Sequence, residues 1–401
     1  MTNPNIKIVS GRCEVEFDLP RLISTFSLSQ LDRDSNYVIV PGFLDVHVHL
    51  REPGFSYKET IKDGTKACAR GGYTAVCPMP NLNPVPDTVE NMMVQKDIID
   101  KDACIHVYPY ASITKGEKGE ELSDMDELKK LAIAFSDDGR GVQTEEMMLE
   151  AMKKAKELDA IIVAHCEVNE LLKGGYIHDG EYAKAHGHRG ICSESEYAQI
   201  ARDIELSRKT GCKYHVCHIS TKESVELIRK AKAEGVNITC ETAPHYLILD
   251  DSMLEESGNW KMNPPLRSVE DKLALIEGIK DGTIDMIATD HAPHTEEEKS
   301  RGLEKSPFGI TGIELAFPLL YTHLVKEGII TLEKLIDLLV INPRKRFDTP
   351  YDGFSVWNLD EEFTVKKEDF LSKGKSTPFI GKKLCGVNYL TVCNNQIVYK
   401  K

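Results

Sequence analysis

The stretch PGFLDVHVHLREPG, residues 41–54, organises the rest of the chain. It completes an apolar run, residues 37–44, which predicts a strand with a local irregularity at its Pro-Gly pair. Successive side chains of a strand alternate between its two faces, so His47 and His49 point to the same side and can bind one cation together. By itself, this pair is equally compatible with two ordinary histidines at the end of a strand.

After this stretch, short apolar strands alternate with helices. Strands are expected to end at His49 and to span residues 73–77, 104–108, 131–135, 160–164, 213–217, 236–240 and 284–288. Helices are expected at residues 58–70, 87–99, 123–130, 144–158, 194–210, 221–234, 269–280, 312–326 and 331–341. Eight strands, most followed by a helix, are typical of an α/β protein with a (β/α)8 TIM-type barrel. A doubly wound sheet is the alternative, but the sequence contains no glycine-rich phosphate loop to support it.

The two ends of the chain have a different pattern. Short strands are expected at residues 6–10, 13–17, 354–359, 363–365 and 389–398. We therefore predict a small β-subdomain formed by residues 1–40 and 350–401, beside a catalytic barrel of residues 41–349. The two termini then meet in the same subdomain.

The composition is that of a globular protein, with 41% hydrophobic and 28% charged residues. A formal net charge of −14 argues against nucleic-acid binding, which needs a basic surface. No apolar run approaches membrane-spanning length, and the N-terminus lacks the features of a signal peptide. The eleven cysteines are scattered without a CxxC pair, as expected for reduced thiols in a cytoplasmic protein.

Metal-binding side chains follow the predicted strands at the points where the strands end. In barrel enzymes, catalytic residues lie at the C-terminal ends of the strands. The side chains in those positions are His47, His49, Asp138, His165, His218 and Asp290. Nitrogen and oxygen ligands of this kind suit zinc. Four histidines and two carboxylates suffice for a two-metal centre, in which one carboxylate and a hydroxide bridge the ions.

Some of these assignments have close competitors. Asp137 and Asp138 are adjacent, and periodicity does not separate them. His218 lies nearer the strand end than His215, which we interpret as structural. Structural or solvated roles are the default for the remaining histidines without a site pattern, namely His106, His178, His186, His188 and His323.

Further polar groups suit an anionic amide substrate. Arg51 can hold a carboxylate through two parallel hydrogen bonds. Asn81 and Asn263 lie in proline-rimmed loops, where an asparagine offers both a donor and an acceptor but is equally common as a turn former. His294 lies four residues beyond Asp290. The segment that contains Phe308 and Gly309 can present backbone groups to a ligand.

Taken together, these segments resemble the bacterial class I dihydroorotases, in the cyclic amidohydrolase branch of the amidohydrolase superfamily. The matching segments are PGFLDVHVHLREPG, MPNLNPVPDT, FSDDG, VAHCE, YHVCHIST, ETAPHYL, KMNPPLR, IATDHAPHT and PFGITGIE. The resemblance implies the reversible cyclisation of N-carbamoyl-L-aspartate to L-dihydroorotate, the third step of pyrimidine synthesis. It also implies a homo-oligomer, namely a dimer, and association with other pyrimidine-pathway enzymes.

The resemblance further implies residue roles. Two Zn2+ ions per subunit are expected, one held by His47, His49, Asp138 and Asp290 and the other by Asp138, His165 and His218. Family spacing selects Asp138 over Asp137 as the bridge, together with hydroxide, and makes Asp290 the general acid and base. The implied substrate contacts are His49, Arg51, Asn81, Asn263, His294, Phe308 and Gly309.

Two other functions remain open at this point. A related cyclic amidase acting on hydantoin or allantoin would share the metal ligands without needing Arg51, Asn81 and His294 as an anion-binding set. A non-catalytic homologue kept as a scaffold typically loses metal ligands, whereas this chain keeps all six.

Overall fold

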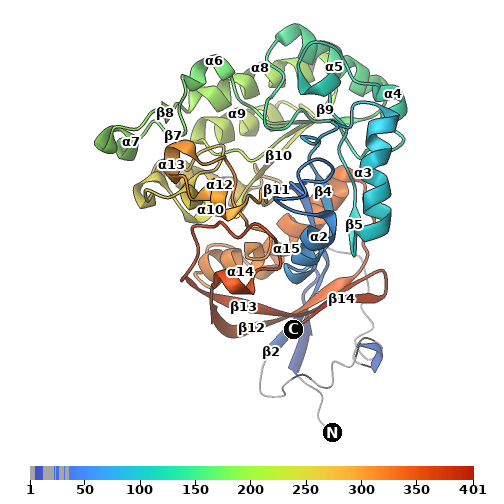
Figure 1. The fold of residues 1–401 in the computed structure, drawn as a ribbon, viewed down its shortest axis with the longest axis vertical. Helices are drawn as coiled ribbons and strands as arrows, with labels where there is room; N and C mark the ends of the chain where they lie inside the picture. The colour runs from blue at the N-terminus through green and yellow to red at the C-terminus, as the bar shows by residue number, and fades with distance from the viewer. Residues whose placement is uncertain (1–4, 12–21, 23, 27–30, 32–35) are drawn as a thin grey trace.

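The computed structural model describes residues 5–11, 22, 24–26, 31 and 36–401. Its larger part is a ring of parallel strands wrapped by helices (Figure 1). The strands are β3 (Phe43–Val48), β4 (Tyr73–Pro78), β5 (His106–Val107), β6 (Ile161–Ala164), β9 (Lys213–Val216), β10 (Ile238–Thr242) and β11 (Met286–Ile287). They form a three-stranded sheet, β3-β4-β5, and a four-stranded sheet, β11-β10-β9-β6.

Single-residue bridges close the ring between these two sheets. Phe135 pairs with Ala111 on one side and with Ile162 on the other, and Val48 pairs with His291. The expected (β/α)8 barrel is therefore confirmed. The expected fourth strand, residues 131–135, is wrong in its extent, because the backbone N–H groups of Leu131 and Ala132 donate to the Leu128 carbonyl and continue a helical turn.

Most long helices of the barrel begin at a side-chain cap. The longer ones are α2 (Ile61–Arg70), α3 (Val89–Asp102), α5 (Glu145–Glu157), α8 (Glu194–Thr210), α9 (Lys222–Ala233) and α11 (Val269–Asp281). Thr144 caps α5, whereas Ser193 precedes α8 without a side-chain cap. Helix α2 starts three residues later than expected because Thr60 is extended and accepts a hydrogen bond from the Asp63 N–H. Helix α3 starts two residues later than expected because Thr88 caps it in the same way.

Shorter elements fill the connections. They are α4 (Met125–Leu128), α6 (Asn169–Leu172), β7 (Ile177–His178), α7 (Glu181–His186), β8 (Gly190–Ile191), α10 (Pro244–Ile248), α12 (Glu296–Lys299) and α13 (Gly302–Lys305), with short 3-10 turns η2 (Lys115–Glu117), η3 (Asp251–Met253), η4 (Gly258–Trp260) and η7 (Lys367–Asp369). The last two predicted helices are α14 (Ala316–Leu320) with η5 (Tyr321–Val325), and α15 (Leu332–Ile336) with η6 (Asp337–Ile341) and α16 (Asn342–Phe347). None of the helices in these ranges is long and apolar enough to cross a membrane.

Segments from both ends of the chain contribute to a separate five-stranded sheet, which lies below the barrel in Figure 1. Its order is β1-β2-β12-β13-β14, with β1 (Asn5–Ile8), β2 (Asn36–Pro41), β12 (Phe354–Thr364), β13 (Lys383–Cys393) and β14 (Gln396–Lys400). The expected β-subdomain is thus present, although its limits at residues 40 and 350 stay a prediction. The strand expected at residues 13–17 lies outside the described residues.

Two expected strand boundaries are wrong. The apolar run of residues 37–44 is not one strand, because the chain passes from β2 in the small sheet to β3 in the barrel at Gly42. A side chain there would collide with the side chain of Thr74, so the junction needs glycine. The two strands expected at residues 354–365 are one strand, β12, with an irregular register between Asn358 and Glu362.

An aromatic cluster joins the barrel to the sheet. The ring of Phe43, on β3, lies 5.3 Å from that of Phe317, on α14, and 6.1 Å from that of Trp357, on β12. The Phe317 and Trp357 rings are 4.4 Å apart. All three side chains are buried, so one continuous core fixes the sheet against the base of the barrel.

Candidate active site

Side chains from five strand positions meet at one end of the barrel. His47 and His49 come from the end of β3, Asp138 from the segment after the Phe135 bridge, His165 and His218 from the ends of β6 and β9, and Asp290 from the end of β11. All six are buried. A hollow of about 140 Å³ opens between them, and its wall also includes Arg51, Asn81, Asn263, Phe308 and Gly309.

The histidine and carboxylate groups lie within reach of shared cations. The Nε2 atom of His47 is 3.2 Å from Asp138 Oδ1 and 3.7 Å from Asp290 Oδ1. His49 Nε2 is 3.5 Å from Asp138 Oδ2 and 3.1 Å from Asp290 Oδ1. Ligand atoms of two groups, His47–His49–Asp290 and His47–Asp138–His218, lie within 4.8 Å of one another. His47 belongs to both groups, and the two oxygen atoms of Asp138 lie near His47 and His49.

The second half of the cluster is formed by His165 and His218. The Nδ1 atom of His165 lies 3.0 Å from His218 Nε2 and 3.7 Å from Asp138 Oδ1. His218 Nε2 lies 3.8 Å from the same oxygen. Nitrogen atoms of two rings thus converge on one carboxylate oxygen.

Three polar atoms of this cluster are buried without a hydrogen-bond partner among the described residues. They are His47 Nε2, Asp138 Oδ1 and His165 Nε2. Buried polar atoms in folded proteins are normally paired, and leaving one unpaired costs about 1–3 kcal/mol. A cation bound between His47 and Asp138 would satisfy the first two atoms, and His165 presents its other ring nitrogen, Nδ1, to the cluster, so the side chains fit a zinc centre.

Glu241, which sequence reasoning missed, lies behind His47. Its Oε1 atom is 2.8 Å from His47 Nδ1, and its Oε2 atom is 3.0 Å from His215 Nε2. Burial disfavours the charged carboxylate, but the contacts with the two histidines outweigh it and lower the pKa of Glu241 to about 2. The ionised group fixes the His47 ring with Nε2 toward the cluster. The position of Glu241 at the end of β10 was the available signal.

The structure separates the two adjacent aspartates. Asp137 accepts hydrogen bonds from the backbone N–H groups of Ile113 and Thr114 and from the Thr114 hydroxyl. Asp138 faces the histidines. Burial opposes its ionisation, but the positive charge of His47 prevails and holds the pKa of Asp138 well below its usual range. Asp138 is therefore the carboxylate that the geometry offers as a ligand.

Asp290 is held in a strained backbone conformation, with φ of +47°. The preceding residue, Thr289, is fixed by a hydrogen bond from its hydroxyl to Asp45, at 2.6 Å. Burial raises the pKa of Asp290, but the hydrogen bond with His49 and the charge of His47 lower it further, to about 2. Asp290 is thus an ionised carboxylate beside the hollow, as a general base requires.

Arg51 lines the cationic side of the hollow and contacts the loop that carries His294. The Nε–H of Arg51 donates to the Pro293 carbonyl at 3.2 Å, and its Nη2 lies 3.2 Å from His294 Nε2. That ring nitrogen also lies 2.7 Å from the Phe308 carbonyl oxygen. Burial and the charge of Arg51 lower the pKa of His294 to about 2, so its ring is neutral. The positive charge here belongs to the guanidinium.

The two asparagines contact the cluster differently. Asn81 Oδ1 lies 3.0 Å from His49 Nδ1, and its amide donates to Asp138 Oδ2 at 3.3 Å, so Asn81 also orients two cluster residues. Asn263 donates to Glu167 at 2.9 Å, while its Oδ1 atom is buried without a partner among the described residues. Glu167 had no sequence signal beyond following His165.

Comparisons with known proteins agree with this arrangement. Residues 36–224 match a family model described as dihydro-orotase-like. The chain is 52% identical to a dihydroorotase of Fusobacterium nucleatum over 373 residues, which cover 91% of this chain and 88% of that protein. Dihydroorotases of Shouchella clausii and Staphylococcus aureus are also 52% identical, with the same coverage.

Solved structures of similar fold include the L-hydantoinase (dihydropyrimidinase) of Arthrobacter aurescens. Its TM-score is 0.83 at 22% identity, over 100% of this chain and 97% of that chain. A D-hydantoinase gives 0.81 at 21% identity, over 99% and 94%. At such identities the likeness shows the barrel fold and its accompanying sheet.

Proposed function

The chain belongs to the dihydroorotase family and catalyses the reversible cyclisation of N-carbamoyl-L-aspartate to L-dihydroorotate, and we propose that the histidine–carboxylate cluster performs this reaction. The observation that carries the proposal is the pair of buried polar atoms His47 Nε2 and Asp138 Oδ1, which lie 3.2 Å apart and make no hydrogen bond. A cluster built only for stability would pair them.

We assign the cluster to two zinc ions. His47, His49, Asp138 and Asp290 would hold one, and Asp138, His165 and His218 the other. When bound, zinc supplies polarisation of the reacting carbonyl and a water molecule of lowered pKa. Glu241 supports the His47 ring from behind. A partner carboxylate of this kind raises the basicity of a histidine ligand.

Asp290 moves the proton in this proposal. In hydrolysis, its carboxylate accepts a proton from the attacking water and delivers it to the ring nitrogen that leaves. In the biosynthetic direction, it accepts the proton of the ureido nitrogen that attacks the side-chain carboxyl group, and passes it to the departing oxygen. Its low pKa keeps it ionised before each transfer.

The other residues hold the substrate. Arg51 binds the carboxylate that takes no part in ring closure, through the fork of its guanidinium. His294, beside Arg51, completes that site, together with the backbone at Phe308 and Gly309 and the amide of Asn81. Asn263 also lines the hollow, and its buried Oδ1 atom, which has no partner among the described residues, suits a ureido N–H.

A direct assay tests this function. The purified chain should interconvert carbamoyl aspartate and dihydroorotate, lose that activity with a chelator, and regain it with Zn2+. Hydantoin and dihydrouracil, rings without the carboxylate, should be turned over far more slowly because they cannot use Arg51. Faster turnover of those rings would favour a hydantoinase-type amidase, and a protein that binds no metal would favour a scaffold.

Assembly and location stay predictions. We propose a homodimer, association with other pyrimidine-pathway enzymes and a cytoplasmic location. Light scattering of the purified chain and co-purification from its own cells test the first two, and cell fractionation tests the third.

A further inference from the structure

The connection between β12 and β13 leaves the small sheet and reaches the rim of the active site. We call residues 370–376 of this connection the strap. Its Leu371 and Ser372 N–H groups donate to the carboxylate of Glu314, at 3.1 Å. Further along, the Thr311 N–H donates to the Ser376 carbonyl at 2.8 Å, and the Thr311 hydroxyl donates to the Gly374 carbonyl at 2.7 Å. The strap is thus bonded to the barrel along its length.

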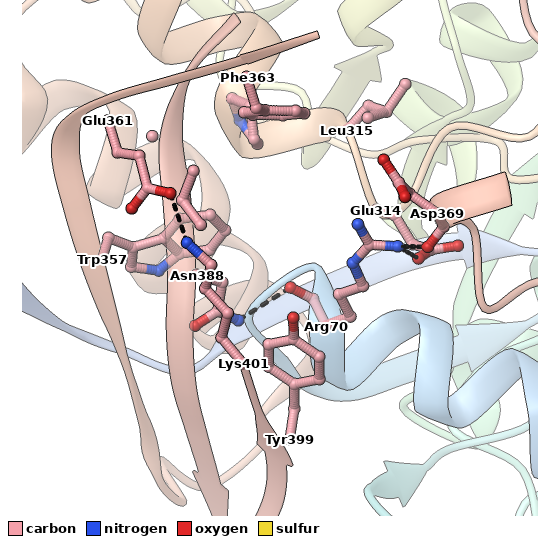
Figure 2. Close-up of a pocket in the computed structure, with 13 residues that line it drawn as sticks. Arg70, Glu314, Leu315, Trp357, Glu361, Phe363, Asp369, Asn388, Tyr399 and Lys401 are labelled. Atoms are coloured by element: carbon pink, nitrogen blue, oxygen red, sulfur yellow. Dashed lines mark hydrogen bonds and ion pairs between the residues drawn. The ribbon is translucent and has the colours of Figure 1, made fainter. Parts of the chain in front are cut away.

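Glu314 anchors the beginning of the strap with an ion pair. Arg70 lies 2.8 Å from its carboxylate and also donates to the carbonyl of Asp369, as Figure 2 shows. These three residues line a hollow of about 270 Å³ between the barrel and the small sheet. The negative charge of Glu314 is therefore balanced by Arg70. A structural role, holding the strap to the barrel, is enough to explain this residue.

Glu59 has no comparable cation among the described residues. Its side chain is fully buried, and its carboxyl group accepts hydrogen bonds from the Ser372 hydroxyl and from the Lys373 N–H, at 3.2 Å. The Lys373 ammonium instead donates to the Ser56 carbonyl, at 2.6 Å. The nearest ring nitrogen, His291 Nε2, is 3.9 Å away. Burying a carboxyl group is costly, and here its hydrogen bonds go chiefly to the strap.

Gly374 brings the strap against the loop that carries His294. A Cβ atom on Gly374 would lie 2.6 Å from the Cβ of Pro293 and 2.7–2.8 Å from the backbone N and O of His294. Its backbone conformation does not require glycine, so the requirement is one of space. The strap backbone is therefore in close contact with the residue that pairs with Arg51.

The strap thus touches both sides of the carboxylate site. Ser56 and Glu59 belong to the loop that begins at Arg51 and ends at the Thr60 cap of α2. Pro293 and His294 belong to the loop after β11, which Arg51 contacts from the other side. A shift of the strap would change the separation of these two loops.

We propose that the strap, acting through Glu59 and Gly374, sets the positions of Arg51 and His294 and so determines affinity for the substrate's carboxylate. Glu59 and Gly374 are positioning residues in this proposal, which rests on the function proposed above. The small sheet thereby takes part in substrate binding without contributing a residue that touches the substrate.

The first test replaces Gly374 with alanine. The added methyl group should push the strap from the His294 loop, raise the KM for dihydroorotate about tenfold and change kcat little, because a misplaced binding group chiefly affects binding. Zinc content should stay at the wild-type value. Gly312→Ala is the matched control, since a Cβ there meets nothing closer than 3.8 Å. An unchanged KM in Gly374→Ala would overturn the proposal.

Two further variants keep the proposal testable if Gly374→Ala does not fold. Glu59→Ala and Ser372→Ala remove hydrogen bonds of the anchor without adding bulk, and both should raise KM in the same direction. In an Arg51→Ala background, each strap variant should have little further effect, because residues acting through the same contact are not additive. If the effects of Arg51→Ala and a strap variant on KM were fully additive, the strap would have a merely structural role. The same conclusion would follow if a strap variant lost both kcat and bound zinc.

The same assays distinguish this proposal from the proposed function. If the zinc-loaded wild-type chain fails to interconvert carbamoyl aspartate and dihydroorotate, the proposed function fails. If the wild type is active but the strap variants keep its KM, only the inference about the strap fails.

Discussion

In the proposed function, Arg51 supplies the positive charge that recognises the substrate's carboxylate. Replacing it with alanine should raise the KM for dihydroorotate by about 10- to 100-fold, because a charge-assisted pair contributes about 1.5–3 kcal/mol. The effect on kcat should be smaller. Steady-state kinetics measures both. Arg301→Ala removes an exposed arginine that pairs with Glu297 and is the matched control. A change in kcat alone would contradict the role of Arg51 in binding.

Asp290 should show the opposite pattern. Asp290→Ala removes the proposed proton carrier, and general acid–base catalysis is typically worth about 10²–10⁴-fold, so kcat should fall by that factor. Circular dichroism should stay that of the wild type. Asp352→Ala, at a partly exposed carboxylate bonded to His106, serves as the control. Wild-type turnover in Asp290→Ala would contradict the mechanism.

Glu59 makes stability depend on pH. Burial raises its pKa to about 7, from 4.5 in the unfolded chain, against hydrogen bonds from Ser372, Lys373 and Thr60. Between these values the folded state holds the extra proton, so the contribution of Glu59 to the free energy of unfolding declines as pH rises from about 4.5 to 7. Asp63 and His291 are the titratable groups that face it.

Glu59→Gln removes this dependence. In metal-free buffer, the variant should gain stability relative to the wild type between pH 5 and 7.5, by at most about 3 kcal/mol. Urea unfolding at the two pH values measures the difference. If the difference in unfolding free energy between the variant and the wild type did not vary with pH, Glu59 would not be the group that causes the pH dependence.

Sequence reasoning predicted the residues of the site better than their supports. His47 and His49 were predicted because metal ligands follow strand ends, whereas Asp138 was chosen over Asp137 only through the family resemblance. Glu241 and Glu59 were missed, because a carboxylate in the sequence carries no sign of what will surround it. The role of such a carboxylate depends on how deeply the fold buries it and on contact partners that lie far away along the chain.

At the scale of elements, the junction between β2 and β3 leaves no room for a side chain at Gly42. Gly42→Ala should destabilise the fold by about 1–3 kcal/mol, because its methyl group would overlap the Thr74 side chain. Urea unfolding measures this loss. Combining it with Thr74→Ala should cost less than the sum of the two single changes. Strict additivity would show that the two residues do not compete for space.

The predicted elements failed where tertiary contacts override local pattern. Residues 37–44 have the apolar pattern of one strand, yet the chain changes sheets at Gly42. Residues 131–135 also look like a strand, but only Phe135 pairs, between Ala111 and Ile162. Helices with a clear period, such as α5 and α8, were predicted to within a residue or two at each end.

At the scale of the whole molecule, metal binding should also increase the free energy of unfolding. Unpaired His47 Nε2, Asp138 Oδ1 and His165 Nε2 penalise the metal-free fold. Zinc at 100 times its Kd should add about 2.7 kcal/mol. Thermal unfolding should therefore show a lower Tm after chelation, restored by Zn2+ more fully than by Mg2+, which prefers oxygen ligands. A Tm that is unchanged by the chelator would contradict a metal centre in this cluster.

The pairing of β2 with β12 has a consequence for synthesis of the chain. Ile39 pairs with Val356, so β2 leaves the ribosome long before its neighbour exists. Until then, β2 exposes an unpaired edge, and Phe43 lacks the cover that Trp357 later provides. Nascent chains stopped before residue 354 should therefore be the forms that aggregate and recruit chaperones, even when every strand of the barrel has been made.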